Sequence, residues 1–164
     1  MPYLHEIVEH LGTDLKPWSP WNDQKVLVTG VHISELAEPT RFLEGGELLL
    51  STGLQLTNSD FDVDEYIRNL HAFGIAGFGF GLGPYFEEVP EHLARACSAV
   101  GLPLFVVPTP TPFQTINEVF WKLQMQAQNA ELLSTLDRQS ALIQSSASDQ
   151  PITAVLSELA TMGN

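Results

Sequence analysis

The stretch Glu47-Leu-Leu-Leu-Ser-Thr52 decides the fold, because a short apolar run directly after two glycines is typical of a buried strand. Apolar runs at residues 75–82 and 102–107 predict two more strands of this kind. Residues 62–73 and 90–100 lie between the runs and have the apolar spacing of helices. Strands joined by helices form βαβ units with parallel pairing. The sequence therefore predicts an α/β fold with a small, mainly parallel sheet and helices packed on it.

Shorter elements are expected before this pattern. Residues 3–11 have the spacing of an amphipathic helix, and a loop rich in Pro and Trp follows them. The β-branched run at residues 25–33 predicts a strand with a bulge at Gly30. Residues 34–38 predict a helical turn that ends at Pro39.

The last third of the chain predicts one long helix followed by a linker. From residue 115 to about residue 146 there is no Pro or Gly, and apolar or small residues recur at steps of three or four. Such a long stripe favours a partner helix, so we expect a homodimer; alternatively, the stripe folds back on the sheet domain. The expected dimerisation residues are Ile116, Phe120, Leu123, Leu133, Leu136 and Ile143.

These patterns divide the chain into three expected parts. Residues 1–113 form the α/β domain, residues 114–146 the long connecting helix, and residues 147–164 a linker with the start of a further region. The final residues resemble the first turns of a helix that the chain does not complete. We therefore expect the chain to be the N-terminal piece of a longer protein.

Composition excludes several classes of function. The chain has 164 residues, and 7 Lys and Arg against 20 Asp and Glu give a net charge of −13. Such an acidic chain repels phosphate backbones and anionic lipid surfaces, so direct nucleic-acid or membrane binding is disfavoured. The single cysteine, Cys97, allows no internal disulfide. No signal peptide or membrane-spanning run is present, so we expect a cytoplasmic protein.

A ligand site is expected at the carboxyl-terminal edge of the sheet, where open parallel sheets usually bind their ligands. Glycines alternate along residues 77–83, which leaves one face of that strand without side chains. This pattern indicates either close packing of a neighbouring element or room for a ligand. The candidate ligand-binding residues are Ser51, Thr52, Gly53, Gly81, Gly83 and Tyr85.

Glu47 is a second candidate, because a carboxylate at the start of a buried strand requires partners. It either accepts backbone N–H groups from a nearby loop, a structural role, or contacts a ligand. The sequence contains no recognisable catalytic constellation, and the spacing of its five histidines does not predict a metal site. We expect no catalytic residues, no metal and no cofactor. Trp18 and Trp21 flank a proline loop, where they either cover the rim of the core or stack on a flat ligand.

Four stretches together resemble the N-terminal domain of PucR-type (purine catabolism regulatory protein-like) transcription regulators of bacteria. The resemblance covers about residues 3–118, and Ser51 stands where the family usually has Thr. The stretches are Val31-His-Ile-Ser-Glu-Leu36, Phe42-Leu-Glu-Gly-Gly-Glu-Leu-Leu-Leu-Ser-Thr-Gly53, Gly79-Phe-Gly-Leu-Gly-Pro-Tyr-Phe86 and Leu102-Pro-Leu-Phe-Val-Val-Pro108.

The resemblance implies a regulatory domain that controls catabolic genes and senses a small molecule or a partner. In this family a C-terminal helix-turn-helix domain, absent from this chain, binds DNA. A purine or another nitrogen metabolite is the implied effector. The alternative is a metabolite-binding enzyme domain that acts at the carboxyl-terminal edge of the sheet. Neither the identity of the effector, nor the regulated genes, nor activation as against repression follows from the sequence.

Overall fold

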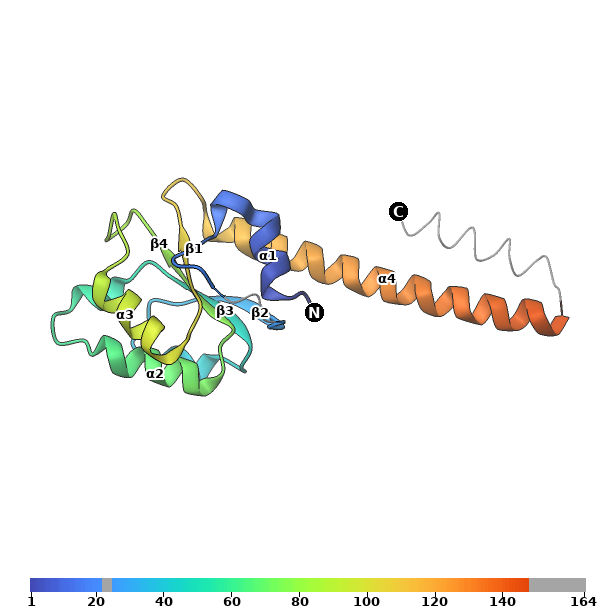
Figure 1. Cartoon of the computed structure of the whole chain (residues 1–164), viewed down its shortest axis with the longest axis horizontal. Coiled ribbons are helices and arrows are strands. Elements are labelled where there is room, and N and C mark those ends of the chain that lie inside the picture. Colours follow the sequence, from blue (N-terminus) through green and yellow to red (C-terminus); the bar gives the residue numbers. More distant parts are fainter. Residues whose placement is uncertain (22–24, 148–164) are drawn as a thin grey trace. The chain divides into compact units, whose positions relative to one another are not determined.

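The computed structural model describes residues 1–21 and 25–147, with side chains up to residue 139 (Figure 1). Contacts between residues divide the chain into two compact units, Met1–Leu123 and Gln124–Asn164. The first unit contains the whole sheet and the start of the long helix. None of the described helices is long and apolar enough to cross a membrane.

The first unit is built on a sheet of five strands in the order β1-β5-β4-β3-β2. Four neighbouring strands run parallel, and the short edge strand β1 is antiparallel to β5. The predicted α/β class with a mainly parallel sheet is therefore confirmed. The strands are β1 (Lys16–Pro17), β2 (Gly30–Ile33), β3 (Glu47–Ser51), β4 (Gly77–Gly81) and β5 (Leu104–Val107).

Two helices cover one face of the sheet, α2 (Val63–Phe73) and α3 (Glu91–Val100) (Figure 1). Asp62 caps α2 by accepting a hydrogen bond from the N–H of Glu65, and Gly74 ends it with a φ of 99°. Leu49, Phe78 and Phe80 point from the strands toward these helices and form the first core.

The opposite face is covered by α1 (Leu4–Leu11) and by the start of α4 (Phe113–Ala147). Leu48 and Leu50 point toward this side, so β3 contributes alternate side chains to two cores. Burial on both faces explains why the strand sequences are continuously apolar rather than alternating. Ile116 and Phe120 of α4 are 0% and 1% exposed within this second core.

The burial of α4 corrects part of the sequence interpretation. Ile116 and Phe120 pack inside the α/β unit, so these two residues do not form the predicted contact with a partner helix. Leu123 packs half-buried against the same core. The alternative, in which the stripe folds back on the sheet domain, holds for these first turns. Leu133 is exposed and Leu136 is half-buried, while the side chain of Ile143 lies outside the described residues.

Three local predictions also differ from the structure. The predicted strand over residues 25–33 is formed only from Gly30 onward, because the N–H groups of Val28 and Thr29 bond to Pro2 and Gly46 instead. Gly30 is thus the first residue of β2. Residues 34–38 form no helical turn, and β1 was not predicted at all. The linker and second helix predicted after Ala147 lie outside the described residues.

Candidate functional site

The Ser51–Thr52–Gly53 turn at the carboxyl end of β3 is organised by one carboxylate, that of Glu35. One oxygen, Oε1, accepts from the backbone N–H and the hydroxyl of Thr52, both at 2.7 Å. The other, Oε2, accepts from the Ser51 hydroxyl at 2.9 Å and from the N–H of Leu54 at 3.2 Å. Glu35 was not among the predicted site residues. No local spacing could have indicated it, since its partners lie 16 to 19 residues further along the chain.

The network continues inward through Gln55. Its Nε2 donates to Ser51 Oγ at 3.1 Å and to the hydroxyl oxygen of Tyr66 at 2.9 Å. Burial raises the pKa of Tyr66 well above its ordinary value, so its hydroxyl stays protonated. Ser51 itself is 0% exposed. The polar groups of the turn are therefore engaged in hydrogen bonds within the protein. Of its three predicted ligand-binding residues, Thr52 is the one that lines the cavity described next.

That cavity, the carboxyl-edge cavity, has a volume of about 190 Å³ and lies where β3, β4 and β5 end. Thr52 and Gly81 line it together with residues of the loop that connects β5 to α4. The lining residues are Thr52, Gly81, Leu82, Pro84, Val107, Pro108, Thr109, Thr111 and Phe113. The structure thus brings two of the predicted residues to one cavity, with Phe113, the first residue of α4, in its wall.

The glycines beside this cavity give room to side chains of the protein. A Cβ at Gly81 would lie 2.5 Å from Cζ of Phe113, and one at Gly83 would lie 2.8 Å from Cγ2 of Thr109. Both distances are far below van der Waals contact, so neither position accepts a larger residue without movement. These contacts match the close-packing interpretation of the alternating glycines.

The other predicted residues lie apart from the cavity. Tyr85 is 49% exposed and lines a separate shallow depression with Phe86 and neighbouring acidic residues. Glu47 lies at the amino end of β3, where its two oxygens accept from the N–H groups of Glu44 and Gly45 at 2.8 and 2.6 Å. These are the bonds that a structural role for Glu47 requires.

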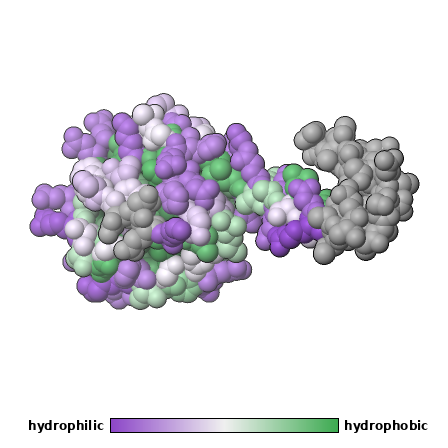
Figure 2. All heavy atoms as spheres, turned by 45° about the vertical axis from the view of Figure 1, so that its right-hand side comes forward, coloured by the Kyte–Doolittle hydropathy of each residue, from purple (hydrophilic) through white to green (hydrophobic). Residues whose placement is uncertain are grey.

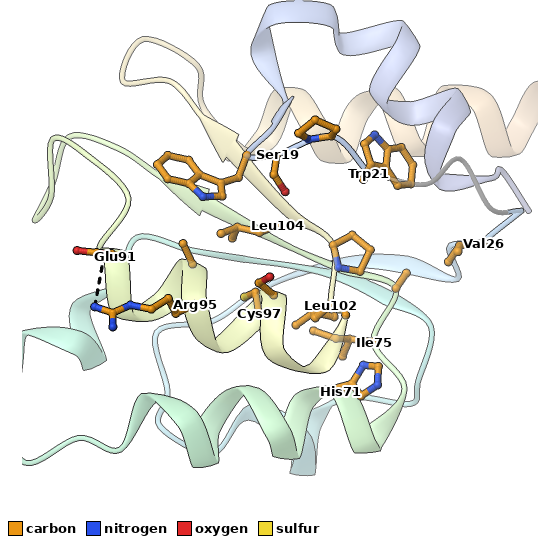
Figure 3. Close-up of a pocket in the computed structure, with 17 residues that line it drawn as sticks. Ser19, Trp21, Val26, His71, Ile75, Glu91, Arg95, Cys97, Leu102 and Leu104 are labelled. Atoms are coloured by element: carbon orange, nitrogen blue, oxygen red, sulfur yellow. Dashed lines mark ion pairs between the residues drawn. The ribbon is translucent and has the colours of Figure 1, made fainter.

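A larger hollow of about 710 Å³, the Trp–Pro hollow, lies at the amino ends of β4 and β5, the opposite ends from the carboxyl-edge cavity (Figure 3). Trp21 closes one wall, packed edge-on against Phe105 with ring centres 5.3 Å apart. Arg95 and Cys97 of α3 lie on the opposite wall, and Leu104 lies between the two walls (Figure 3). The sequence indicated the tryptophans but not this hollow. No residue of α4 lines it.

Comparison with known proteins places these features in a family. The sequence model of the Purine catabolism regulatory protein-like family matches residues 22–123. The chain belongs to this family. Over 81 residues it is 26% identical to the "Purine catabolism regulatory protein" of Bacillus subtilis (strain 168); the match covers 49% of this chain and 15% of that protein. The chain is thus similar to a small part of a much longer relative.

One solved structure resembles the fold loosely. It contains the CBS and DRTGG domains of the regulatory region of Clostridium perfringens pyrophosphatase, complexed with its activator diadenosine tetraphosphate. The sequence identity is 11% and the TM-score is 0.47, over 71% of this chain and 45% of the other. At this level of similarity the likeness carries no inference about the present chain.

The matched family region contains both the Glu35 network and every residue of the carboxyl-edge cavity. It ends at the residue where the first compact unit ends, Leu123. The family region and the α/β unit therefore coincide at this boundary, and the region includes the buried start of α4. The finding supports a regulator-type domain.

Two chemical properties of the described residues bear on the site. Within residues 1–21 and 25–147, no group of three or more His, Cys, Asp or Glu side chains is placed to hold a metal ion.

Burial raises the pKa of the Cys97 thiol to about 12. Because the thiolate is the nucleophile, Cys97 is expected to be inert toward thiol reagents in the folded protein at neutral pH.

Replacing Glu35 by alanine is expected to destabilise the protein by about 2 kcal/mol, because two backbone N–H groups and two hydroxyls lose a charged acceptor. Urea denaturation followed by circular dichroism measures the change. Glu38→Ala is the matched control, since Glu38 is an exposed carboxylate three residues away. An equal, small effect of both substitutions would show that the network contributes little.

Proposed function

We propose that this chain is the signal-receiving part of a bacterial regulator of catabolic genes. It binds a small effector without transforming it and passes the result to the rest of the protein through α4. Contact with DNA is made by a helix-turn-helix outside residues 1–164. Membership of the regulator family supports the proposal, as does the net charge of −13, which disfavours binding of phosphate backbones by this part.

The observation that carries the proposal is the position of Phe113. It is the first residue of α4, it lines the carboxyl-edge cavity, and its ring lies against Gly81 of β4. Three residues further along, Ile116 is fully buried in the core. Any rearrangement of the cavity therefore acts directly on the start of the helix, without a long chain of intermediate contacts.

The connection between β5 and α4 is stiff enough to transmit such a rearrangement. It has the sequence Pro108-Thr-Pro-Thr-Pro112, in which three prolines fix φ. The hydroxyl of Thr111 donates to Oδ1 of Asp14 at 2.7 Å, which fixes the loop to the turn that follows α1. A displacement at the cavity is thus carried by a restrained loop rather than absorbed by a flexible one.

The cavity also limits the effector. About 190 Å³ is below the range of roughly 300–1,000 Å³ usual for drug-sized ligands, so the effector is small, of the size of one heterocyclic ring system. Its lining combines threonine hydroxyls with proline and phenylalanine surfaces. Such a lining suits an uncharged, hydrogen-bonding planar molecule, and the family's name suggests a compound of purine catabolism. To regulate, the effector must bind one arrangement of α4 more tightly than another.

Thermal-shift measurements on the chain test the proposal, with hypoxanthine and xanthine as the planar compounds added, and with urate (anionic at neutral pH) and allantoin (non-planar) as comparisons that should stabilise the chain less. An effector present at a hundred times its Kd should stabilise the folded chain by about 2.7 kcal/mol. Gly81→Ala, which drives a methyl group against Phe113, should reduce that stabilisation, whereas Trp18→Ala in the Trp–Pro hollow should not. If Trp18→Ala reduced the stabilisation and Gly81→Ala did not, the effector would bind in the Trp–Pro hollow, which would contradict the role of Phe113.

The expected homodimer through α4 stays part of this proposal, now restricted to the helix beyond Leu123. Leu132 and Leu133 are 58% and 48% exposed there, so apolar surface is available to a partner. A double substitution, Leu132→Lys with Leu133→Lys, should lower the dimer fraction measured by light scattering. An unchanged dimer fraction would exclude this segment as the contact.

A further inference from the structure

The two edges of the sheet differ in how they are protected. The β1 edge is two residues long and consists of Lys16 and Pro17, a charge and a residue without an N–H group. Both features discourage another strand from pairing there. The β2 edge, Gly30–Ile33, contains no charged residue and no proline, and in the described part of the chain β2 pairs only with β3. Residues 30–33 therefore form the one unprotected edge of the described sheet.

The hydrogen-bond pattern shows which groups of β2 remain available. The N–H of Ser34 donates to the carbonyl of Leu50 at 3.0 Å. Because bonded residues alternate along a strand, the even-numbered residues face β3, and Val31 and Ile33 direct their N–H and C=O groups outward. Their side chains share one face of the sheet, since they pair in register with Leu48 and Leu50 of the second core. Ile33 is 50% exposed.

We propose that β2 pairs antiparallel with β2 of a second copy of this chain, about a two-fold axis that passes through His32. A two-fold axis makes the paired strands antiparallel and places each residue opposite its symmetry counterpart. Val31 of one copy then lies opposite Ile33 of the other, in the hydrogen-bonded pairs that the outward groups can form. The apolar side chains of each pair meet on one face, and the two His32 residues lie opposite each other on the axis.

The second copy is the favoured occupant because this edge is self-complementary and locally uncharged. Two chains of net charge −13 repel each other, so close contact requires a surface without exposed carboxylates. Two carboxylates adjoin the strand, Glu35 after its end and Glu47 beside Gly30. Both accept hydrogen bonds from groups of their own chain, Glu35 from Ser51, Thr52 and Leu54 and Glu47 from Glu44 and Gly45. Leu36 and Leu54, 50% and 43% exposed, flank the end of the strand and extend the apolar surface. This contact is independent of any pairing through α4.

A cysteine substitution at the axis tests the proposal. In His32→Cys, the two thiols would stand in a non-hydrogen-bonded antiparallel pair, with Cα atoms about 4.5 Å apart, which is within the range that a disulfide spans. The native Cys97 is 1% exposed and does not compete. The full chain is oxidised with copper–phenanthroline, and the covalent dimer is quantified by non-reducing electrophoresis. Ser59→Cys, in an exposed turn away from β2, measures cross-linking by random collision.

The expected result is a covalent dimer that forms at least about tenfold faster in His32→Cys than in Ser59→Cys. Adding Ile33→Lys to His32→Cys should remove that advantage, since it places two charges in the contact, whereas adding Leu133→Lys should not. Equal circular dichroism spectra and melting temperatures show that the variants are folded. Cross-linking of His32→Cys at the rate of the Ser59→Cys control would overturn the proposal. So would rapid cross-linking that Leu133→Lys abolishes and Ile33→Lys does not.

Discussion

Replacing Phe120 with alanine is expected to destabilise the α/β unit by about 4 kcal/mol, although Phe120 lies on the long helix rather than in the sheet domain as the sequence divides it. The side chain is 1% exposed and packs in the core formed with α1 and the strands. Removing it leaves a cavity that the surrounding residues fill only partly. Urea denaturation followed by tryptophan fluorescence measures the loss.

The neighbouring residue provides the control for this prediction. Trp121 is 54% exposed, and its ring packs edge-on against that of Phe120 with centres 5.3 Å apart. Trp121→Ala should therefore change the free energy of unfolding by less than about 1 kcal/mol. Equal losses for the two variants would mean that α4 is not anchored in the core at Phe120.

Gly53→Ala is expected to destabilise the protein by about 3 kcal/mol for two separate reasons. Gly53 has a φ of 85°, a left-handed conformation that costs an alanine about 1–2 kcal/mol. The added Cβ would also lie 2.7 Å from Cε2 of Phe80, a ring with 0% exposure, and overpacking of this kind costs about 1–3 kcal/mol. Thermal or chemical denaturation gives the change directly.

Gly74→Ala separates the two contributions. Gly74 ends α2 with a φ of 99°, but nothing lies within 4 Å of an added Cβ there. Gly74→Ala should therefore lower the free energy of unfolding only by the cost of the left-handed backbone conformation, about 1–2 kcal/mol. If Gly53→Ala destabilised the protein no more than Gly74→Ala does, the close approach of the added Cβ to Phe80 would not contribute to the loss of stability.

The βαβ core could be predicted because local signals agreed there. Each buried strand was a continuous apolar run, and α2 was bounded by a capping Asp62 and a closing Gly74. The prediction failed where tertiary contacts overrode local preference. Three of the residues 25–29 are β-branched, yet the N–H groups of Val28 and Thr29 bond to two different distant segments.

The candidate site was predictable only in part. The position of Thr52 and Gly81 at one edge followed from the parallel topology. The roles of Glu35 and Phe113 did not, since each acts on residues far away in the sequence. Glu35 lies in the stretch Val31–Leu36 that carries the family resemblance, but that stretch alone does not indicate its hydrogen-bond partners. Likewise, the stripe on α4 has the same periodicity whether it faces its own sheet or a partner, so Ile116 and Phe120 could be placed only by the fold.

Hydrophilic and hydrophobic residues are interspersed on the visible face of the α/β unit (Figure 2). On this face we therefore expect binding at particular sites rather than through one broad apolar surface.

Under the proposed function, the start of α4 responds to the state of the carboxyl-edge cavity. Hydrogen–deuterium exchange on the wild-type chain and on Gly81→Ala tests it most directly, because the added methyl group displaces Phe113 without any ligand. We expect faster exchange in Gly81→Ala at the amides of residues 114–123, with exchange in α2 and α3 unchanged. Unchanged exchange at residues 114–123, or an equal increase throughout the unit, would contradict it.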